Sequence, residues 1–464
     1  MNSLSNTVVQ ERSSSWQQGN RLRILVLAPF CDPNMVSVPF VTYCHAAALG
    51  KIHDVTLVVG SPSEGNVRGA NGPFRTIEVV RMPRLERIYD WFLRKVFKYN
   101  FDNQKLTAFS YPFSLAFEWS AWRQLKGRIH RGEFDVVLRV LPMSAVVPSP
   151  FAYLLRKGPI PFVIGPINGG LPWPSGFSQL EHQKEWISGL RSLYRYMPFA
   201  RSTYRDAAAI IAASSQTCAE FATYRDKVFF IPENGVSQSL CADAAGSPKR
   251  DDRLNLIFVG GLVPRKACDL AIRAAAPLLK AGLARFSVFG GGPEQARLEE
   301  LVRSLEISDS VSFSNGWVSH AEVLEHLRSA DVLVFPSLRD FGGGVVFEAL
   351  ALGAVPLVVD FGGPGDIVHP DVGYKVALTS ENDIVAQMQT ILTELAHNGE
   401  LLDRLRRKGK IYARETLTWD AKAQAVTRIL NWTLQRGPKP DFQPPKILAR
   451  EFGSSSQKQC QTTA

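Results

Sequence analysis

Pro336-Ser-Leu-Arg-Asp-Phe-Gly-Gly-Gly-Val-Val-Phe-Glu-Ala-Leu-Ala-Leu-Gly353 is the stretch that decides the fold. The apolar run 331–336 that precedes it is typical of a buried parallel strand, and a helix is expected from Gly344 onward. A glycine loop between such a strand and helix offers backbone N–H groups to an anion. Asp340 and Glu348, one on each side of the glycines, can accept hydrogen bonds from hydroxyls. Phosphate and hydroxyls together indicate a nucleotide-sugar as the ligand.

The alternation of strand and helix extends in both directions from this stretch. Residues 21–28 and 55–59 are expected to be strands that flank a helix at 38–49. A polar segment at 242–253 then interrupts the pattern, which restarts with a strand at 254–259. Strands that alternate with helices of this length predict an α/β fold with two doubly wound parallel sheets.

Composition narrows the class of protein. The 464 residues are 45% apolar, enough for two cores, and the formal charge of +10 with a pI near 9.3 favours anionic partners. A solvated basic surface explains the charge equally well. The basic residues are not interleaved with a stacking face and no recognition module is present, so we expect no nucleic-acid partner.

Cysteine spacing and hydropathy indicate the cellular compartment of the protein. The six cysteines form no Cys-x-x-Cys pair, which favours a reducing cytosol. The first 20 residues lack a signal-peptide core, and no apolar run reaches the roughly 18–20 residues of a membrane-spanning helix. We therefore expect a cytoplasmic protein without a transmembrane helix.

Four further loops follow expected strands of the second half, at 260–266, 290–293, 315–317 and 361–366. Taken singly, each has an ordinary explanation: glycine pairs make tight turns, and Asp340 would cap the helix that begins at Gly344. In parallel α/β sheets, however, ligands bind outside the carboxyl ends of the strands, where all these loops converge. Their joint order therefore favours a binding site.

Metal-binding patterns are missing from the sequence. The eight histidines show no His-x-x-x-His spacing, and no Asp-x-Asp occurs. We expect no metal and no cofactor, with cationic side chains and helix N-termini neutralising a diphosphate instead.

Residues 254–430 resemble the nucleotide-sugar-binding domain of the family 4 glycosyltransferases, which have the GT-B fold. The resemblance is carried by Gly260-Gly-Leu-Val-Pro-Arg-Lys266, Gly290-Gly-Gly-Pro293, the acid-x7-Glu spacing of Asp340 and Glu348, and Gly362-Gly363. It implies two Rossmann-like domains facing a cleft. The expected division is a disordered arm (1–20), an acceptor-side domain (21–243), a linker (244–253), a nucleotide-sugar-binding domain (254–417), a helix crossing back to the first domain (418–436) and a disordered tail (437–464).

The resemblance also implies roles for individual residues. Glu348 would accept hydrogen bonds from the ribose and Asp340 from the donor sugar, while Lys266, helped by Arg265, would neutralise the leaving diphosphate. The loops would contact the nucleotide-sugar through Gly260, Gly261, Gly290, Gly291, Gly343, Gly344 and Val345.

Two positions depart from the family pattern. Gly261 stands where relatives usually have Arg, so Arg265 is a candidate substitute, and Asp340 is one methylene shorter than the usual Glu. In the first half, Asn168 and Gly169 occupy the place of an acceptor-side His. The segment 230–236 resembles the Pro-Asn-Gly-Val segment of the family, near the cleft.

A basic amphipathic segment at 85–99 brings Ile88, Trp91, Phe92 and Lys95 near one another if it is helical. Such a helix can lie on an anionic membrane, or it can pack its apolar face on the core. A second segment of similar composition lies at 191–201.

The function expected from these features is that of a retaining glycosyltransferase. It would move a hexose-type sugar from a UDP-, GDP- or ADP-sugar to a glycan or lipid-linked acceptor, in surface polysaccharide or glycoconjugate synthesis, with peripheral contact to an anionic membrane. A nucleotide-sugar epimerase on the same fold and a non-catalytic sugar-nucleotide-binding scaffold are the alternatives.

Overall fold

The computed structural model describes residues 21–35, 37–95, 104–171, 174, 177, 196–242 and 253–444. The expected arm at 1–20, most of the expected linker and the tail beyond residue 444 lie outside these residues, as do residues 191–195 of the basic segment 191–201.

The first domain is built on a parallel seven-stranded sheet with the order β3-β2-β1-β4-β5-β6-β7. Its strands are β1 (Arg23–Leu27), β2 (Asp54–Gly60), β3 (Thr76–Val80), β4 (Val136–Arg139), β5 (Phe162–Ile167), β6 (Ala209–Ala212) and β7 (Val228–Phe230). Its helices are α2 (Val38–Ile52), α3 (Glu64–Gly69), α4 (Pro83–Lys95), α5 (Gln104–His130), α6 (Pro150–Leu155), α8 (Ala200–Asp206) and α9 (Ser215–Glu220). The short helix α10 (Gln238–Ala242) follows in sequence but packs against the core of the second domain.

The second domain has a parallel six-stranded sheet with the order β10-β9-β8-β11-β12-β13. The strands are β8 (Leu254–Val259), β9 (Ala284–Phe289), β10 (Val311–Phe313), β11 (Val332–Phe335), β12 (Val355–Val359) and β13 (Tyr374–Val376). The helices are α11 (Cys268–Lys280), α12 (Gln295–Ser304), α13 (His320–Ser329), α14 (Gly344–Leu352), α15 (Gly362–Ile367), α16 (Glu381–His397) and α17 (Gly399–Tyr412). The helix α18 (Trp419–Thr433) follows this domain in sequence.

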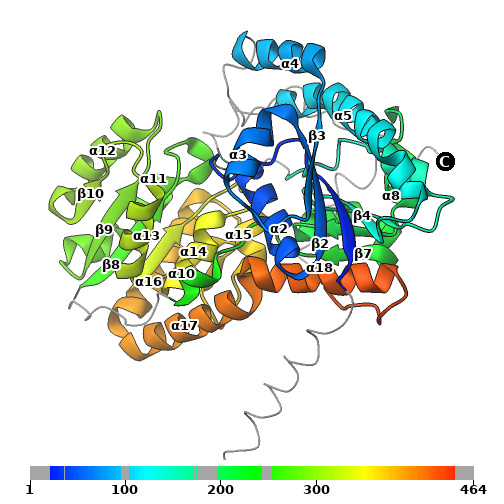
Figure 1. Cartoon of the computed structure of the whole chain (residues 1–464). Helices are drawn as coiled ribbons and strands as arrows, with labels where there is room; N and C mark the ends of the chain where they lie inside the picture. The colour runs from blue at the N-terminus through cyan, green and yellow to red at the C-terminus, as the bar shows by residue number, and fades with distance from the viewer. Residues whose placement is uncertain are drawn as a thin grey trace, which may run out of the picture.

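The period-two alternation of a strand explains how the first sheet is covered on both faces. Ile24 and Val26 of β1 belong to the core beneath α2 and α18, whereas Leu25 and Leu27 point to the opposite core beneath α5 and α6. Figure 1 shows the two domains side by side, with α18 running below the first of them. Because both faces are buried, the strand needs the continuous apolar run that the sequence has.

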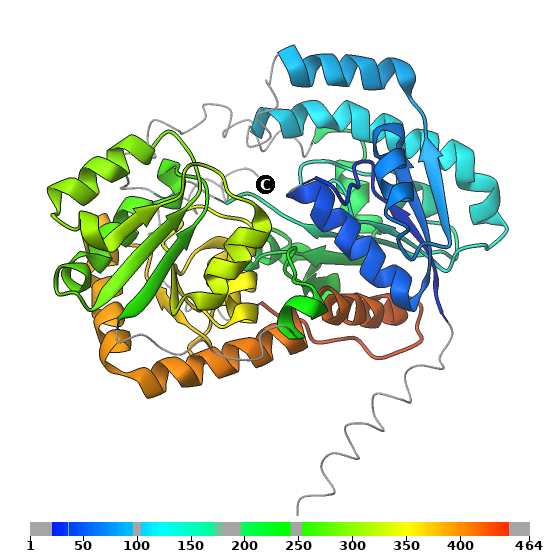
Figure 2. The same cartoon turned by 60° about the vertical axis from the view of Figure 1, so that its left-hand side comes forward.

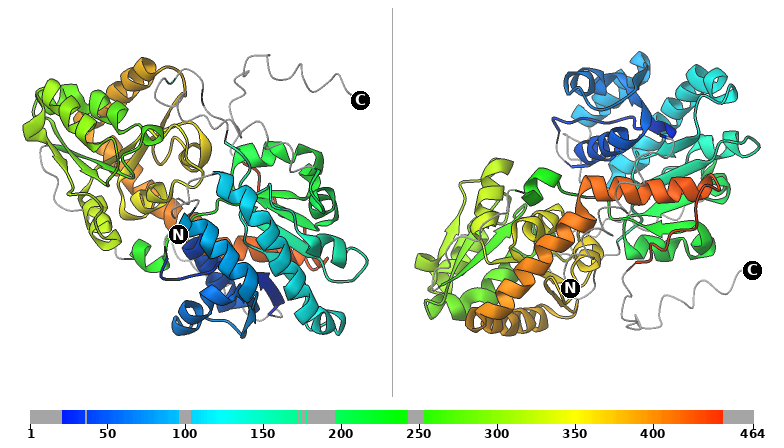
Figure 3. Two further views of the ribbon diagram at one scale, coloured as in Figure 1. Left: turned by 90° about the horizontal axis from the view of Figure 1, so that it is seen from above. Right: turned by 60° about the horizontal axis from the view of Figure 1, so that its bottom comes forward.

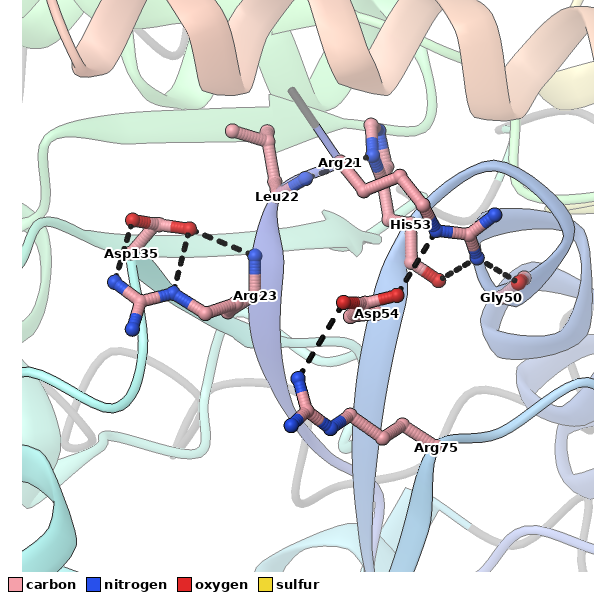
Figure 4. A network of polar contacts seen from close by, with 8 residues as sticks. All are labelled: Arg21, Leu22, Arg23, Gly50, His53, Asp54, Arg75 and Asp135. Carbon is pink, nitrogen blue, oxygen red and sulfur yellow. Dashed lines mark hydrogen bonds and ion pairs between the residues drawn. The ribbon is translucent and has the colours of Figure 1, made fainter.

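Ion pairs fix the amino end of β1 in its sheet (Figure 4). The Arg23 guanidinium and backbone N–H donate to Asp135, just before β4, at 2.8 to 3.3 Å. On the other side, Arg21 donates to the Asp54 carboxylate at 2.9 Å and to the His53 carbonyl at 2.8 Å, next to β2. These contacts hold β1 between β2 and β4 at the amino ends of the strands, opposite the loops that follow their carboxyl ends.

The C-terminal helix α18 belongs in space to the first domain, although it follows the second domain in sequence (Figure 3). Lys51 of α2 pairs with Asp420 at 2.7 Å, and His53 contacts the Thr427 hydroxyl at 2.8 Å. A β-bridge joins Val236 to Thr418, so that the two segments passing between the domains lie side by side.

Helix α4 lies along the outer edge of the first domain, apart from the sheet (Figure 2). Its apolar side chains Leu85, Ile88 and Trp91 are 41%, 53% and 54% exposed. The interpretation of this segment as a helix that buries its apolar face on the core is therefore wrong for these three residues. Glu86 ties the start of the helix to the domain by accepting a hydrogen bond from the Ser61 hydroxyl at 2.6 Å.

The prediction of two doubly wound α/β domains is confirmed. In the second half, β8, β11 and α14 lie within a few residues of the expected elements, whereas the loop expected at 361–366 is the helix α15. β13 was not anticipated because its three residues carry too short a pattern. In the first half, β5 extends to Ile167. The strand thus ends directly before Asn168, which places this residue at the carboxyl edge of the sheet.

Candidate functional site

The site begins where the order of strands in the second sheet reverses. β8 lies between β9 and β11, so the loops after β8 and β11 leave on either side of this switch point, where open α/β sheets bind ligands. The Leu338 N–H donates to the Arg265 carbonyl at 2.9 Å, which joins the two loops. Residues that are more than 70 positions apart in sequence thus form one surface.

Helix α14 starts at this surface because Gly343 takes a left-handed conformation, with φ at 55°. A Cβ at Gly343 would lie 2.9 Å from the Pro364 ring, so both the backbone angle and the available space require glycine. The apolar residues of α14 are buried on the core, and Glu348 is a polar residue that remains partly exposed on it. The N-terminus of α14 is therefore fixed beside the loops that follow β8 and β11.

Lys266 and Asp340 form an ion pair between the loops, with their side chains only 16% and 15% exposed. The second oxygen of Asp340 accepts the Gly342 and Gly343 N–H groups at 3.3 and 3.1 Å. Burial raises the pKa of Asp340, but the Lys266 and Arg265 charges and the Gly343 N–H outweigh it, so the pKa is lowered. Asp340 is thus an anion that both caps the loop and holds Lys266 at the start of α14.

Glu348 lies farther along α14 and pairs with a residue of α13. Its Oε1 is 2.7 Å from Nε2 of His320, whose side chain is 68% exposed. This hydrogen bond raises the pKa of His320, although burial opposes it. The Glu348 carboxylate therefore points toward a partly exposed imidazole at the surface of the domain.

The glycines after β8 and β9 lie against each other and against Trp317. Gly260 and Gly290 have φ angles of 157° and 139°, and the Leu262 N–H donates to the Gly291 carbonyl at 3.0 Å. A Cβ at Gly291 would lie 3.2 Å from the Trp317 ring, and one at Gly261 would lie 3.6 Å from it. The absence of side chains at these glycines therefore makes room for an indole that is itself 75% exposed.

The loop after β5 forms the facing wall in the first domain. The Gly169 N–H donates to the Thr217 hydroxyl at 2.7 Å, and the Gly170 N–H donates to the Glu220 carboxylate at 2.8 Å. These bonds hold the turn, and the Asn168 amide points from it to the Glu233 carboxylate.

Glu233 belongs to the segment that leaves the first domain. A Cβ at Gly342 would lie 2.5 Å from Oε1 of Glu233, so this carboxyl group contacts the backbone of the Asp340 loop directly. Burial, followed by the charge of Asp340, raises the pKa of Glu233 to about 7. The second domain's loop and the first domain's carboxyl group therefore meet at one place.

Two other contacts join the domains nearby. The Ser215 N–H and hydroxyl donate to the Asp366 carboxylate at 2.8 and 2.6 Å. The Arg339 guanidinium donates to the Leu171 carbonyl at 3.2 Å. The arrangement places Lys266, Asp340 and Glu348 on one side and Asn168 on the other, as parts of one interdomain surface.

Sequence reasoning did not assign roles to Glu233, His320 and Trp317. The segment Pro232-Glu-Asn-Gly-Val236 was noted only for its likeness to a family motif. A carboxyl group at such a turn carries no local signal of its partner, because that partner is the backbone of the other domain. The exposure of Trp317 is equally invisible in a local pattern.

Among the described residues, no three His, Cys, Asp or Glu side chains converge as ligands for a metal ion. Every helix in that part of the chain is too short or too polar to cross a lipid bilayer.

Comparison with known proteins identifies the second domain. Residues 242–412 match the family described as glycosyl transferases group 1. The D-inositol 3-phosphate glycosyltransferase of Kineococcus radiotolerans is 30% identical over 235 residues, which are 45% of this chain and 52% of that relative. The chain thus spans about half the length of this curated relative.

Two solved structures are similar over nearly the whole chain. A glycosyltransferase from Rickettsia africae ESF-5 has a TM-score of 0.58 at 14% identity and covers 90% of this chain and 100% of its own. Anabaena Alr3699/HepE in complex with UDP has a TM-score of 0.57 at 14% identity, with 89% and 100% covered. At this identity the likeness establishes the fold. Residues 242–412 are therefore similar to the group 1 glycosyl transferases, and the chain as a whole has the two-domain GT-B fold.

Proposed function

We propose that this protein is a retaining glycosyltransferase that uses a nucleoside diphosphate sugar as donor. The observation that carries the proposal is the meeting of Lys266, Asp340 and the N-terminus of α14 at the switch point of the second sheet. A half-buried cation beside a helix N-terminus fits a diphosphate, and Glu348 lies one turn farther along, where a ribose would extend.

In the proposed reaction, the bond between the anomeric carbon and the β-phosphate oxygen breaks. A bond from that carbon to the acceptor hydroxyl oxygen forms on the same face of the sugar, and the hydroxyl proton passes to the leaving diphosphate. Lys266, with Arg265 nearby, stabilises the negative charge that develops on the leaving group. Gly344 and Val345 add backbone N–H groups, whereas the N–H of Gly343 is used by Asp340 in this structure.

A panel of nucleotides and nucleotide-sugars tests this proposal. We expect one of UDP-glucose, GDP-mannose and ADP-glucose to bind in the micromolar range and to be hydrolysed slowly without an acceptor, as measured by calorimetry and diphosphate release. UDP is the first nucleotide to test, because a UDP complex is known for a protein of the same fold. Release of a free epimer of the sugar would indicate an epimerase instead. Binding without any turnover, with a range of glycan and lipid-linked acceptors present, would favour a scaffold.

For the acceptor, we propose a glycan or lipid-linked sugar at the surface of an anionic membrane, reached from the cytoplasmic side, as in surface polysaccharide or glycoconjugate synthesis. The support is the exposed stripe of Leu85, Ile88 and Trp91 on α4, flanked by exposed Arg84 and Arg87. An apolar stripe with cationic neighbours is the pattern of a helix that lies in the headgroup region of a membrane. The cysteines of the described residues, all free thiols, fit a reducing compartment.

Vesicle binding tests the membrane proposal. We expect the protein to sediment with phosphatidylglycerol vesicles but not with phosphatidylcholine vesicles, and to be released by salt. The double variant Ile88→Ser/Trp91→Ser should lower the partition coefficient about tenfold, since two apolar side chains no longer enter the bilayer. Trp119→Ser, at another exposed tryptophan of the same domain, is the matched control. Equal loss in the control, or no loss in the double variant, would contradict a role for α4.

A further inference from the structure

The proposed function assigns no role to the buried amide group of Asn168 on the interdomain surface. Asn168 is only 9% exposed, and its Oδ1 has no hydrogen-bond partner, while its Nδ2 donates to the Glu233 carboxylate. A buried amide oxygen without a partner is costly, so native structures usually supply one, in a protein group, a water molecule or a ligand. If the amide were turned over, its nitrogen would be the unpaired atom instead, so the group has an unused hydrogen-bonding position in either orientation.

Glu233 adds a second polar group at the same place. Its carboxyl group contacts the backbone of Gly342, which is two residues from Asp340, and it senses the negative charge of Asp340. Asn168 and Glu233 therefore face the loop to which the donor sugar is assigned, from the side of the first domain.

The Glu233 side chain is not needed to hold its own backbone. The His45 ring, on α2, lies 2.7 Å from the Glu233 carbonyl, and the Lys422 ammonium, on α18, donates to the Pro232 carbonyl at 2.7 Å. The main chain at this turn is thus fixed from both sides by other residues, and the Lys422 charge also acts on the Glu233 carboxyl group.

The chemistry of the pair suits sugar hydroxyls. A hydroxyl both donates and accepts a hydrogen bond, and the pair offers an amide with one unused position beside a carboxyl group. With a pKa near 7, Glu233 carries a proton part of the time at neutral pH and can act as donor or acceptor. An anionic ligand group at this position would be repelled by Asp340, whereas a neutral ring would not.

We infer that Glu233 and Asn168 form the first domain's half of the donor-sugar site and hydrogen-bond the sugar hydroxyls across from Asp340. The inference rests on the proposed function and extends it, because it makes sugar recognition depend on both domains. In the proposed function the nucleotide is assigned to residues of the second domain, so the two contributions can be separated by experiment.

The test compares the affinity of a nucleoside diphosphate with that of its sugar derivative. Calorimetry is carried out on the full chain with UDP and UDP-glucose, GDP and GDP-mannose, and ADP and ADP-glucose. For the pair that wild type binds best, Glu233→Gln and Asn168→Ala should each weaken binding of the sugar nucleotide about five- to tenfold, while the affinity for the diphosphate changes less than about twofold. Glu220→Gln, which alters the carboxylate that holds Gly170 in the same loop, is the matched control and should affect neither ligand selectively.

The outcomes distinguish the inference from the proposed function. If wild type binds a sugar nucleotide and both variants bind it equally well, the inference is wrong and the proposed function stands. If the variants lose affinity for diphosphate and sugar nucleotide to the same extent, or if Glu220→Gln reproduces the selective loss, the residues serve only the structure of the loop, and the inference is again overturned. If wild type binds none of the six ligands, the proposed function itself fails, and the inference fails with it.

Discussion

Replacement of Glu348 by alanine is expected to weaken nucleoside diphosphate binding about 100-fold, equivalent to ~2.7 kcal/mol. The reason is that two ribose hydroxyls would lose a charged acceptor in a partly buried position, where the Glu348 side chain is 22% exposed. Glu348→Gln should lie between wild type and Glu348→Ala, because an amide oxygen still accepts a hydrogen bond but without charge. Calorimetric titration with UDP, or with the nucleotide found in the panel, measures the effect.

Two controls sharpen the Glu348 experiment. His320→Ala removes the partner of Glu348 in this structure and should change nucleotide affinity by less than about threefold, since the carboxylate remains. Wild type should discriminate against the 2′-deoxy nucleotide, and Glu348→Ala should not, because the group that senses this hydroxyl is gone. If Glu348→Ala binds the nucleotide like wild type, or still discriminates against the 2′-deoxy form, the assignment of the ribose site to α14 is wrong.

Replacement of Lys266 by alanine is expected to lower kcat about 10²- to 10³-fold, with a much smaller change in KM for the donor. The ammonium group is nearly buried, lies 4.8 Å from the centre of the Phe335 ring and stands at the start of α14, so its charge is poorly screened by solvent. Its largest contribution should come when the diphosphate gains negative charge as it leaves. Steady-state kinetics of donor hydrolysis or transfer give both constants.

A second variant separates catalysis from the ground-state ion pair of Lys266. If Lys266 only balances the charge of Asp340, then Asp340→Asn should restore activity to Lys266→Ala. If Lys266 neutralises the leaving diphosphate, the double variant should stay as slow as Lys266→Ala. Lys280→Ala, at a half-exposed lysine of α11 in the same domain, should leave kcat unchanged. Restored activity in the double variant, or a loss of less than about threefold in Lys266→Ala, would rule out the proposed role.

The sequence suggested two different roles for Asp340. As a residue before a glycine-rich helix start, it was open to interpretation as a helix cap or as a sugar-binding acid. In the structure one oxygen accepts the loop N–H groups and the other pairs with Lys266. The N-cap of α14 is Gly343, without a side-chain capping bond, so Asp340 holds the loop ahead of the helix and does not cap the helix itself. The sugar-binding role stays a prediction, and the sugar hydroxyls would have to share the second oxygen with Lys266.

The helix α4 shows what a hydropathy pattern does not predict, namely whether the apolar face of a helix is buried. The pattern at 85–99 is that of an amphipathic helix, and a helix begins at Pro83 as expected from its composition. Whether its apolar face meets the core or the solvent depends on where the domain places the helix, which periodicity does not encode. The position of α4 in the domain therefore determines that Ile88 and Trp91 are exposed.

The sequence by itself determined the strand, loop and helix units of both domains and the glycines at their junctions. These are local properties: an apolar run such as 254–259 forms a buried strand, and only glycine tolerates the backbone angle of residue 343 beside Pro364. Tertiary structure alone decided which polar groups meet. Lys266 and Asp340 are 74 residues apart, and Asn168 and Glu233 are 65 apart. Their pairing depends on the order of the strands within each sheet, which brings distant loops together, and a partner that is brought in from such a distance leaves no trace in the residues around either group.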